Sequence, residues 1–106
     1  MVSFFDHLQN NYYEKIHYDK TSVDYAKNIY ACFLIRSNVE YTQLDKYFYM
    51  IICYMIAIKY NEKFEPNPYE LLYLLPDKDF FNKEDIKRSE EYIMKILNYD
   101  ITKYLF

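Results

Sequence analysis

The chain contains no glycine among its 106 residues. Glycine is the residue that most readily adopts the positive φ angles of tight hairpin turns, so its absence argues against a sheet of short β-hairpins. Apolar stretches at helical spacing are instead separated by Asn, Asp and Pro. Apolar residues make up 52% of the chain, enough for one hydrophobic core at this length. The composition therefore predicts an all-α fold with a single domain over residues 1–106.

Five helices are expected from apolar periodicity and from capping residues at their starts. The predicted helices are Phe4 to His17, Ser22 to Ser37, Gln43 to Tyr60, a short helix that starts at Asn67-Pro68 and ends at Pro76, and Lys83 to Asn98. The third is apolar on all sides in its middle, which is typical of a helix surrounded by others. Its apolar run, Tyr47 to Ile58, is twelve residues long. A membrane helix needs about 20, so we expect a central core helix and no membrane contact.

Composition also disfavours several classes of function. The net charge of −3 leaves no basic excess for binding nucleic acid. Catalytic loops that require glycine are excluded, and His7 and His17 have no partners at metal-ligand spacing, so neither a metal nor another cofactor is expected. Cys32 and Cys53 both lie in apolar segments that are predicted to be helical. They are interpreted as buried thiols of a reducing, intracellular compartment.

Two segments carry a stronger signal than periodicity. Residues 55–62 read M-I-A-I-K-Y-N-E, and residues 88–102 read R-S-E-E-Y-I-M-K-I-L-N-Y-D-I-T. They resemble L-L-A-S-K-Y-E-E and R-M-E-x-x-I-L-x-x-L-x-F-D-L-T of the cyclin family. A weaker similarity, F-F-D-H-L for L-V-D-W-L, lies at residues 4–8. The resemblance extends over residues 4–102 and implies a minimal five-helix cyclin box.

The resemblance implies a cyclin-like regulator that binds a cyclin-dependent kinase and shifts its C-helix toward the active state. The chain would not itself be an enzyme, and it would act in the nucleus or the cytoplasm. Lys59 would donate to main-chain carbonyls of the kinase, and Glu90 would accept from main-chain N–H groups and help to hold Lys59 in place. The apolar part of the partner-binding surface would come from Ile56, Tyr60, Met94 and Ile101.

Other interpretations stay open. Taken alone, Lys59 is a favourable cation at a helix C-terminus, and Glu90 is a surface residue within reach of Lys87 or Lys95. The family's first-helix tryptophan is replaced by His7, and we expect no second cyclin box. These departures favour, as an alternative, a cyclin-fold adaptor or inhibitor that does not activate a kinase. A further alternative is an unrelated helical interaction bundle that forms a homodimer.

Overall fold

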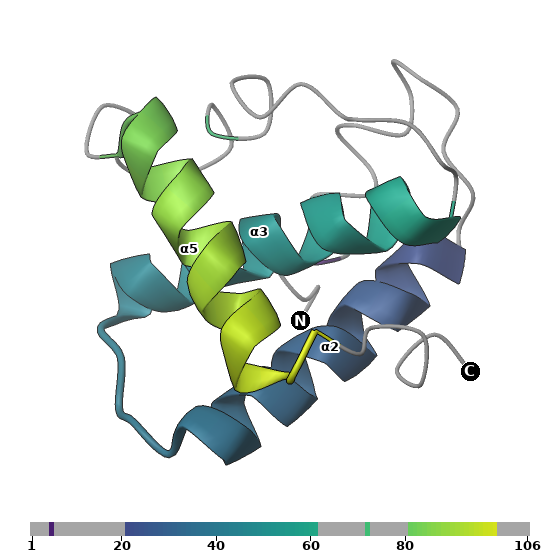
Figure 1. Cartoon of the computed structure of the whole chain (residues 1–106), viewed down its shortest axis with the longest axis horizontal. Coiled ribbons are helices and arrows are strands. Elements are labelled where there is room, and N and C mark those ends of the chain that lie inside the picture. The colour runs from purple at the N-terminus through teal and green to yellow at the C-terminus, as the bar shows by residue number, and fades with distance from the viewer. Residues whose placement is uncertain (1–4, 6–20, 62–71, 73–80, 100–106) are drawn as a thin grey trace.

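The structure is a computed structural model that describes residues 5, 21–61, 72 and 81–99 (Figure 1). The described residues contain three helices and no strand: α2 (Thr21–Ser37), α3 (Gln43–Asn61) and α5 (Lys83–Ile96). The all-α prediction is therefore confirmed for this part of the chain. Of the predicted first and fourth helices, Phe5 and Leu72 have helical backbone and are buried. The other residues of these two helices lie outside the described residues, so the five-helix count stays a prediction.

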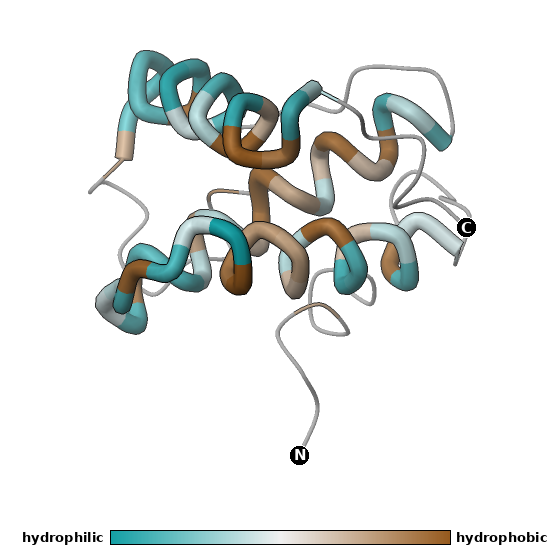
Figure 2. The backbone as a smooth tube through the Cα atoms, turned by 60° about the horizontal axis from the view of Figure 1, so that its bottom comes forward, coloured by the Kyte–Doolittle hydropathy of each residue, from teal (hydrophilic) through white to brown (hydrophobic). Residues whose placement is uncertain are grey.

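Helix α3 lies between the other two helices. Figure 1 shows α5 crossing over α3, with α2 running along the other side, and Figure 2 shows the apolar residues of α3 in the middle of this arrangement. The middle of α3 is buried because its apolar residues occur on every side of the helix rather than in one stripe. Its eight buried residues are Phe48, Ile51, Ile52, Cys53, Tyr54, Ile56, Ala57 and Ile58.

Two helix starts follow the predicted capping chemistry. At the start of α3, the backbone N–H of Asp45 donates to Thr42 Oγ1 at 3.2 Å. At the start of α5, Asn82 and Asp85 form a reciprocal capping box, with hydrogen bonds of 2.9 and 3.0 Å. These bonds satisfy backbone donors that have no partner within the helix. Helix α2 differs slightly from the prediction, because Thr21 is already its first helical residue.

Helices α2 and α5 end where the backbone turns into the left-handed region. Asn38 has a φ angle of 51°, and Asn98 and Tyr99 have φ angles of 57° and 59°. Asparagine tolerates this region better than most residues and takes the place that glycine often occupies at a helix end. The N–H of Tyr99 donates to the carbonyl of Met94 at 2.8 Å. Helix α5 therefore ends at Ile96, two residues earlier than predicted.

Candidate functional site at the α3–α5 junction

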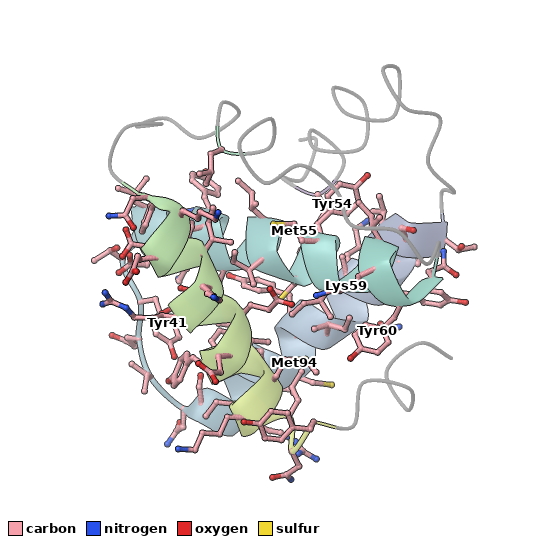
Figure 3. All side chains as sticks on the ribbon, turned by 45° about the horizontal axis from the view of Figure 1, so that its top comes forward. Tyr41, Tyr54, Met55, Lys59, Tyr60 and Met94 are labelled. Carbon is pink, nitrogen blue, oxygen red and sulfur yellow. The ribbon has the colours of Figure 1, made fainter. Side chains whose placement is uncertain are left out.

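The last turn of α3 lies against the middle of α5, and Lys59 and Glu90 form an ion pair there. Lys59 Nζ donates to Glu90 Oε1 at 3.1 Å. The two side chains are 39% and 31% exposed, so water reaches the pair without surrounding it. Figure 3 shows Lys59 at this junction, beside Tyr60 and facing α5. The structure thus brings together the two charged residues that were singled out 31 positions apart in the sequence.

Helix geometry explains why these side chains meet. Ile86 and Ile93 are the buried residues of α5, and they define the edge of that helix that faces the core. Glu90 lies three residues before Ile93, so it projects from nearly the same face toward α3. Lys59 is the basic residue of the last turn of α3, where its charge is favourable to the helix dipole. The pair therefore connects the end of one helix to the inner edge of another.

The apolar residues predicted around this pair differ in their exposure. Tyr60 is 43% exposed, and Met94, one turn after Glu90, is partly exposed. Ile56 is only 1% exposed and belongs to the core, because its side chain projects inward from α3. A partner docked on this conformation would have no direct access to Ile56, so we leave that residue out of the exposed surface. Ile101 lies outside the described residues, and its role stays a prediction.

Met55 belongs to the same region, although it was not among the residues predicted from the sequence. It lies one turn before Lys59 on α3, it is partly exposed, and it packs against the core. Figure 3 shows Met55 and Lys59 on the side of α3 that faces the viewer. The i, i+4 spacing of Met55 and Lys59 could have predicted that the two side chains lie on the same side of α3. Lys59, Glu90, Met55, Tyr60 and Met94 are together named the junction surface.

An aromatic cluster on the other side of α5 was also missed. The hydroxyl groups of Tyr41 and Tyr92 lie 3.0 Å apart and share a hydrogen bond. This bond, with burial and the nearby Tyr41 and Tyr49 hydroxyls as smaller causes, raises the pKa of Tyr92 to about 12. Burial, together with Tyr41 and Asp45, raises the pKa of Tyr49 as well. The raised pKa values keep Tyr49 and Tyr92 neutral at physiological pH. The separation of Tyr41 and Tyr92 in the sequence hides their contact from any local pattern.

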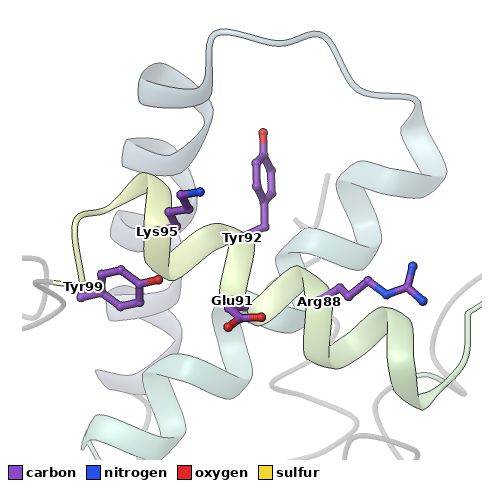
Figure 4. A pocket seen from close by; sticks show the side chains of 5 residues that line it. All are labelled: Arg88, Glu91, Tyr92, Lys95 and Tyr99. Carbon is purple, nitrogen blue, oxygen red and sulfur yellow. The ribbon is translucent and has the colours of Figure 1, made fainter.

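A shallow surface pocket of about 330 Å³ lies along α5. Figure 4 shows its five lining side chains, two basic, one acidic and two aromatic, along the helix and just beyond its end. They are Arg88, Glu91, Tyr92, Lys95 and Tyr99. The mixed charges select neither an anion nor a cation. None of the residues that line the pocket belongs to the junction surface.

Two further properties concern the described residues. They contain no group of three or more His, Cys, Asp or Glu side chains suited to holding a metal ion. None of the described helices has the length and apolar character needed to span a bilayer.

Cys32 and Cys53 are both free thiols, and burial raises the pKa of Cys53. A buried thiol of this kind is a poor nucleophile, so Cys53 acts as a small core residue.

Comparison with known families gives one match. The model of the cyclin N-terminal domain matches residues 5–102, which is nearly the whole chain. The chain belongs to the cyclin family. No curated protein and no solved structure gives a match. Both segments that carried the resemblance, residues 55–62 and residues 88–102, fall within the matched range.

Membership of the cyclin family gives the junction surface a context. Cyclin domains are regulatory rather than catalytic, and kinases are their general class of partner. In this cyclin, the surface lies between two helices and combines an ion pair with adjacent apolar side chains. Partner binding by Lys59, Glu90, Tyr60 and Met94 stays a prediction at this point.

Proposed function

We propose that this cyclin binds a cyclin-dependent kinase through the junction surface and shifts the C-helix of that kinase toward its active position. The observation that carries the proposal is the Lys59–Glu90 ion pair, which spans α3 and α5 at 3.1 Å beside the half-exposed Tyr60. The proposal treats residues 1–106 as a single cyclin box. It also assigns the chain to the nucleus or the cytoplasm, where such a kinase acts.

The chemistry of the pair suits recognition of a helix and the backbone next to it. The Lys59 ammonium group donates hydrogen bonds, and the Glu90 carboxylate accepts them, so the pair presents one charged donor and one charged acceptor. Hydrogen bonds from charged groups to main-chain amides are stronger than neutral ones when the interface excludes water. The mutual contact of Lys59 and Glu90 holds both side chains in place before binding, which lowers the entropy lost on association.

Apolar contact would come from the side chains around the pair. Tyr60 offers a large surface with few rotatable bonds, and Met94 and Met55 adapt their shape to an apolar partner. Ile101 is proposed to extend this area. Ile56 is proposed to support it from within the core rather than to touch the kinase.

Activation would be a shift of populations in the kinase. An active kinase requires an ion pair between a C-helix glutamate and the lysine that positions ATP. A cyclin that binds the inward C-helix more tightly than the outward one favours the active state by that difference in affinity. All catalytic residues would belong to the kinase, so the cyclin itself would not be an enzyme.

Co-purification with a panel of cyclin-dependent kinases tests the proposal. Lys59→Ala and Glu90→Ala should each weaken binding by about tenfold or more, because removing one charge leaves the other desolvated and unpaired in the complex. The matched controls are Glu84→Ala and Arg88→Ala. These residues form another ion pair of α5, at 3.2 Å, but their side chains are 78% and 74% exposed. Binding that is absent, or that ignores Lys59 and Glu90, would refute the proposal.

Phosphoryl transfer to a peptide substrate tests activation separately. The proposed function predicts that the bound kinase transfers phosphate faster than the free kinase. Binding with no increase in rate would instead identify a cyclin-fold adaptor or inhibitor.

A further inference from the structure

We propose that four aromatic residues position α5 and thereby hold Glu90 and Met94 in register with the end of α3. The group, named the aromatic clasp, consists of Phe33, Tyr41, Tyr49 and Tyr92. The consequence for kinase binding rests on the proposed function. The consequence for the Lys59–Glu90 contact does not, because that contact exists in the free chain.

The aromatic clasp joins every described helix to the connection between α2 and α3. Tyr92 of α5 sets its ring edge-on to Phe33 of α2, with centroids 5.7 Å apart. Tyr41, in the α2–α3 connection, stacks on Phe33 at 5.8 Å and meets Tyr49 of α3 edge-on at 4.9 Å. These edge-on and stacked arrangements are the ones that aromatic pairs favour.

The Tyr41–Tyr92 hydrogen bond adds direction to this packing. Its two oxygen atoms are 3.0 Å apart, and the bond is only partly buried. Ring packing alone allows one ring to slide over another, whereas a hydrogen bond between two hydroxyl groups requires a narrow range of distances and angles. The bond therefore fixes where the Tyr92 side of α5 lies relative to the α2–α3 connection.

The aromatic clasp and the ion pair hold α5 from opposite sides. Successive residues of a helix are rotated by about 100°. Relative to the fully buried Ile93, Glu90 and Met94 lie on one flank of α5, and Tyr92 lies on the other. Figure 3 shows this directly, with Tyr41 on one side of α5 and Lys59 and Met94 on the other.

The contacts are also spread along α3. Tyr49 and Lys59 are ten residues apart on that helix, which corresponds to about 15 Å. The two buried residues of α5, Ile86 and Ile93, are seven positions apart and lie along one line of the helix, so burial alone would let α5 roll about that line. Contacts on both flanks oppose that rotation. The aromatic clasp residues are therefore positioning residues, since they act on the junction surface through α5 without belonging to that surface.

The free chain provides the first test. The coupling between Lys59 and Glu90 is measured as a double-mutant cycle of Tm values, using Lys59→Met and Glu90→Gln. The cycle is then repeated in Tyr92→Phe and in Tyr41→Phe, each of which removes the hydrogen bond and keeps the rings. We expect both backgrounds to lose most of the coupling. A coupling that persists unchanged in both would overturn the proposal, even if Tm falls.

Thr42→Ala is the matched control. It removes the hydrogen bond between Asp45 and the Thr42 hydroxyl at the start of α3, one residue from Tyr41. A helix cap and a partly buried hydrogen bond contribute similar stability, so Tm should fall by a similar amount. The Lys59–Glu90 coupling should survive in this control. Equal loss of coupling in the control and in the Phe variants would show a general structural effect and would refute a positioning role.

Kinase affinity provides the second test, at a temperature where all variants are folded. We expect Tyr92→Phe and Tyr41→Phe to raise Kd by about fivefold, equivalent to about 1 kcal/mol. Thr42→Ala should leave Kd within about twofold. If the unmodified chain binds no kinase, the proposed function fails, whereas the double-mutant cycle still decides the role of the aromatic clasp.

Discussion

Helices α3 and α5 meet at the junction surface but are held in the fold in different ways. Eight of the 19 residues of α3 are buried, and they occur all round the helix. Two of the 14 residues of α5 are buried, Ile86 and Ile93. Burial of apolar area stabilises a structure without specifying direction, whereas hydrogen bonds and ion pairs specify geometry. Helix α3 is thus held by the extent of its burial, and α5 by a few directional contacts.

This difference matters for a binding surface made by both helices. Lys59 lies on the helix whose position is set by the core, and Glu90 lies on the helix whose position is set by its cap, the ion pair and the aromatic clasp. Changes in α5 should therefore alter the surface at little cost in overall stability. Changes in the middle of α3 should unfold the domain.

The largest expected effect comes from comparing a buried residue of α3 with a buried residue of α5. Ile52→Ala in α3 removes a side chain that is 0% exposed and should lower the free energy of unfolding by roughly 2–5 kcal/mol. Ile86→Ala, at the first turns of α5, removes a side chain that is 6% exposed, and the neighbouring structure can relax more easily. Ile86→Ala should therefore lower the free energy of unfolding by less than Ile52→Ala does. Urea denaturation followed by circular dichroism measures both, and a larger loss from Ile86→Ala would reverse the comparison.

Alkaline pH should weaken both the core, through Tyr30 of α2, and α5, through Tyr92. Burial, with the Cys53 thiolate as a smaller cause, raises the pKa of Tyr30 to about 12, and the bond to Tyr41 is the main cause that raises the pKa of Tyr92 to about 12. An unfolded tyrosine ionises near pH 10. The folded state therefore favours the neutral form, and this stability is complete below about pH 10 and lost as pH rises toward about 12.

Thermal denaturation between pH 9 and pH 12 measures this loss. Tyr30→Phe should reduce the fall in Tm that comes from the core, and Tyr92→Phe should reduce the fall that comes from α5. The two variants thus separate the regions. If Tyr92→Phe loses Tm over this range as steeply as the unmodified chain, the hydrogen bond of the aromatic clasp contributes nothing to the alkaline transition.

Sequence was sufficient for those features that depend on nearby residues. The starts of α3 and α5 were predicted because capping residues and their partners lie within four residues of each other. Thr42 accepts a hydrogen bond from the Asp45 N–H, and Asn82 forms a reciprocal capping box with Asp85. The end of α5 was placed two residues late, since the apolar pattern continues through Leu97 while the backbone turns at Asn98 and Tyr99. Left-handed turns at residues other than glycine are hard to anticipate from a pattern that favours helix.

The candidate site was only partly predictable, because it depends on contacts between residues that are far apart in the sequence. Lys59 and Glu90 were found through the family resemblance, which carries information on distant contacts that periodicity lacks. Ile56 was expected to contact a partner, yet it is buried in the free chain, because spacing alone does not tell which side of an all-round apolar helix another element covers. The Tyr41–Tyr92 bond joins residues 51 positions apart, and the fifteen tyrosines of the chain gave no means of choosing this pair.

The smallest expected effects compare two polar contacts within α5. Asn82→Ala breaks the capping box and leaves backbone donors of the first turn without a protein partner, so the free energy of unfolding should fall by about 1 kcal/mol. Glu84→Ala and Arg88→Ala break an exposed pair of the same helix and should each cost less than about 0.5 kcal/mol. Urea denaturation at low and high salt separates the two, since salt screens the exposed pair and hardly affects a cap. If Glu84→Ala destabilised the chain as much as Asn82→Ala, exposed charges would stabilise α5 as strongly as its helix cap does. The difference between α3 and α5 would then be one of burial against surface electrostatics rather than of burial against directional contacts.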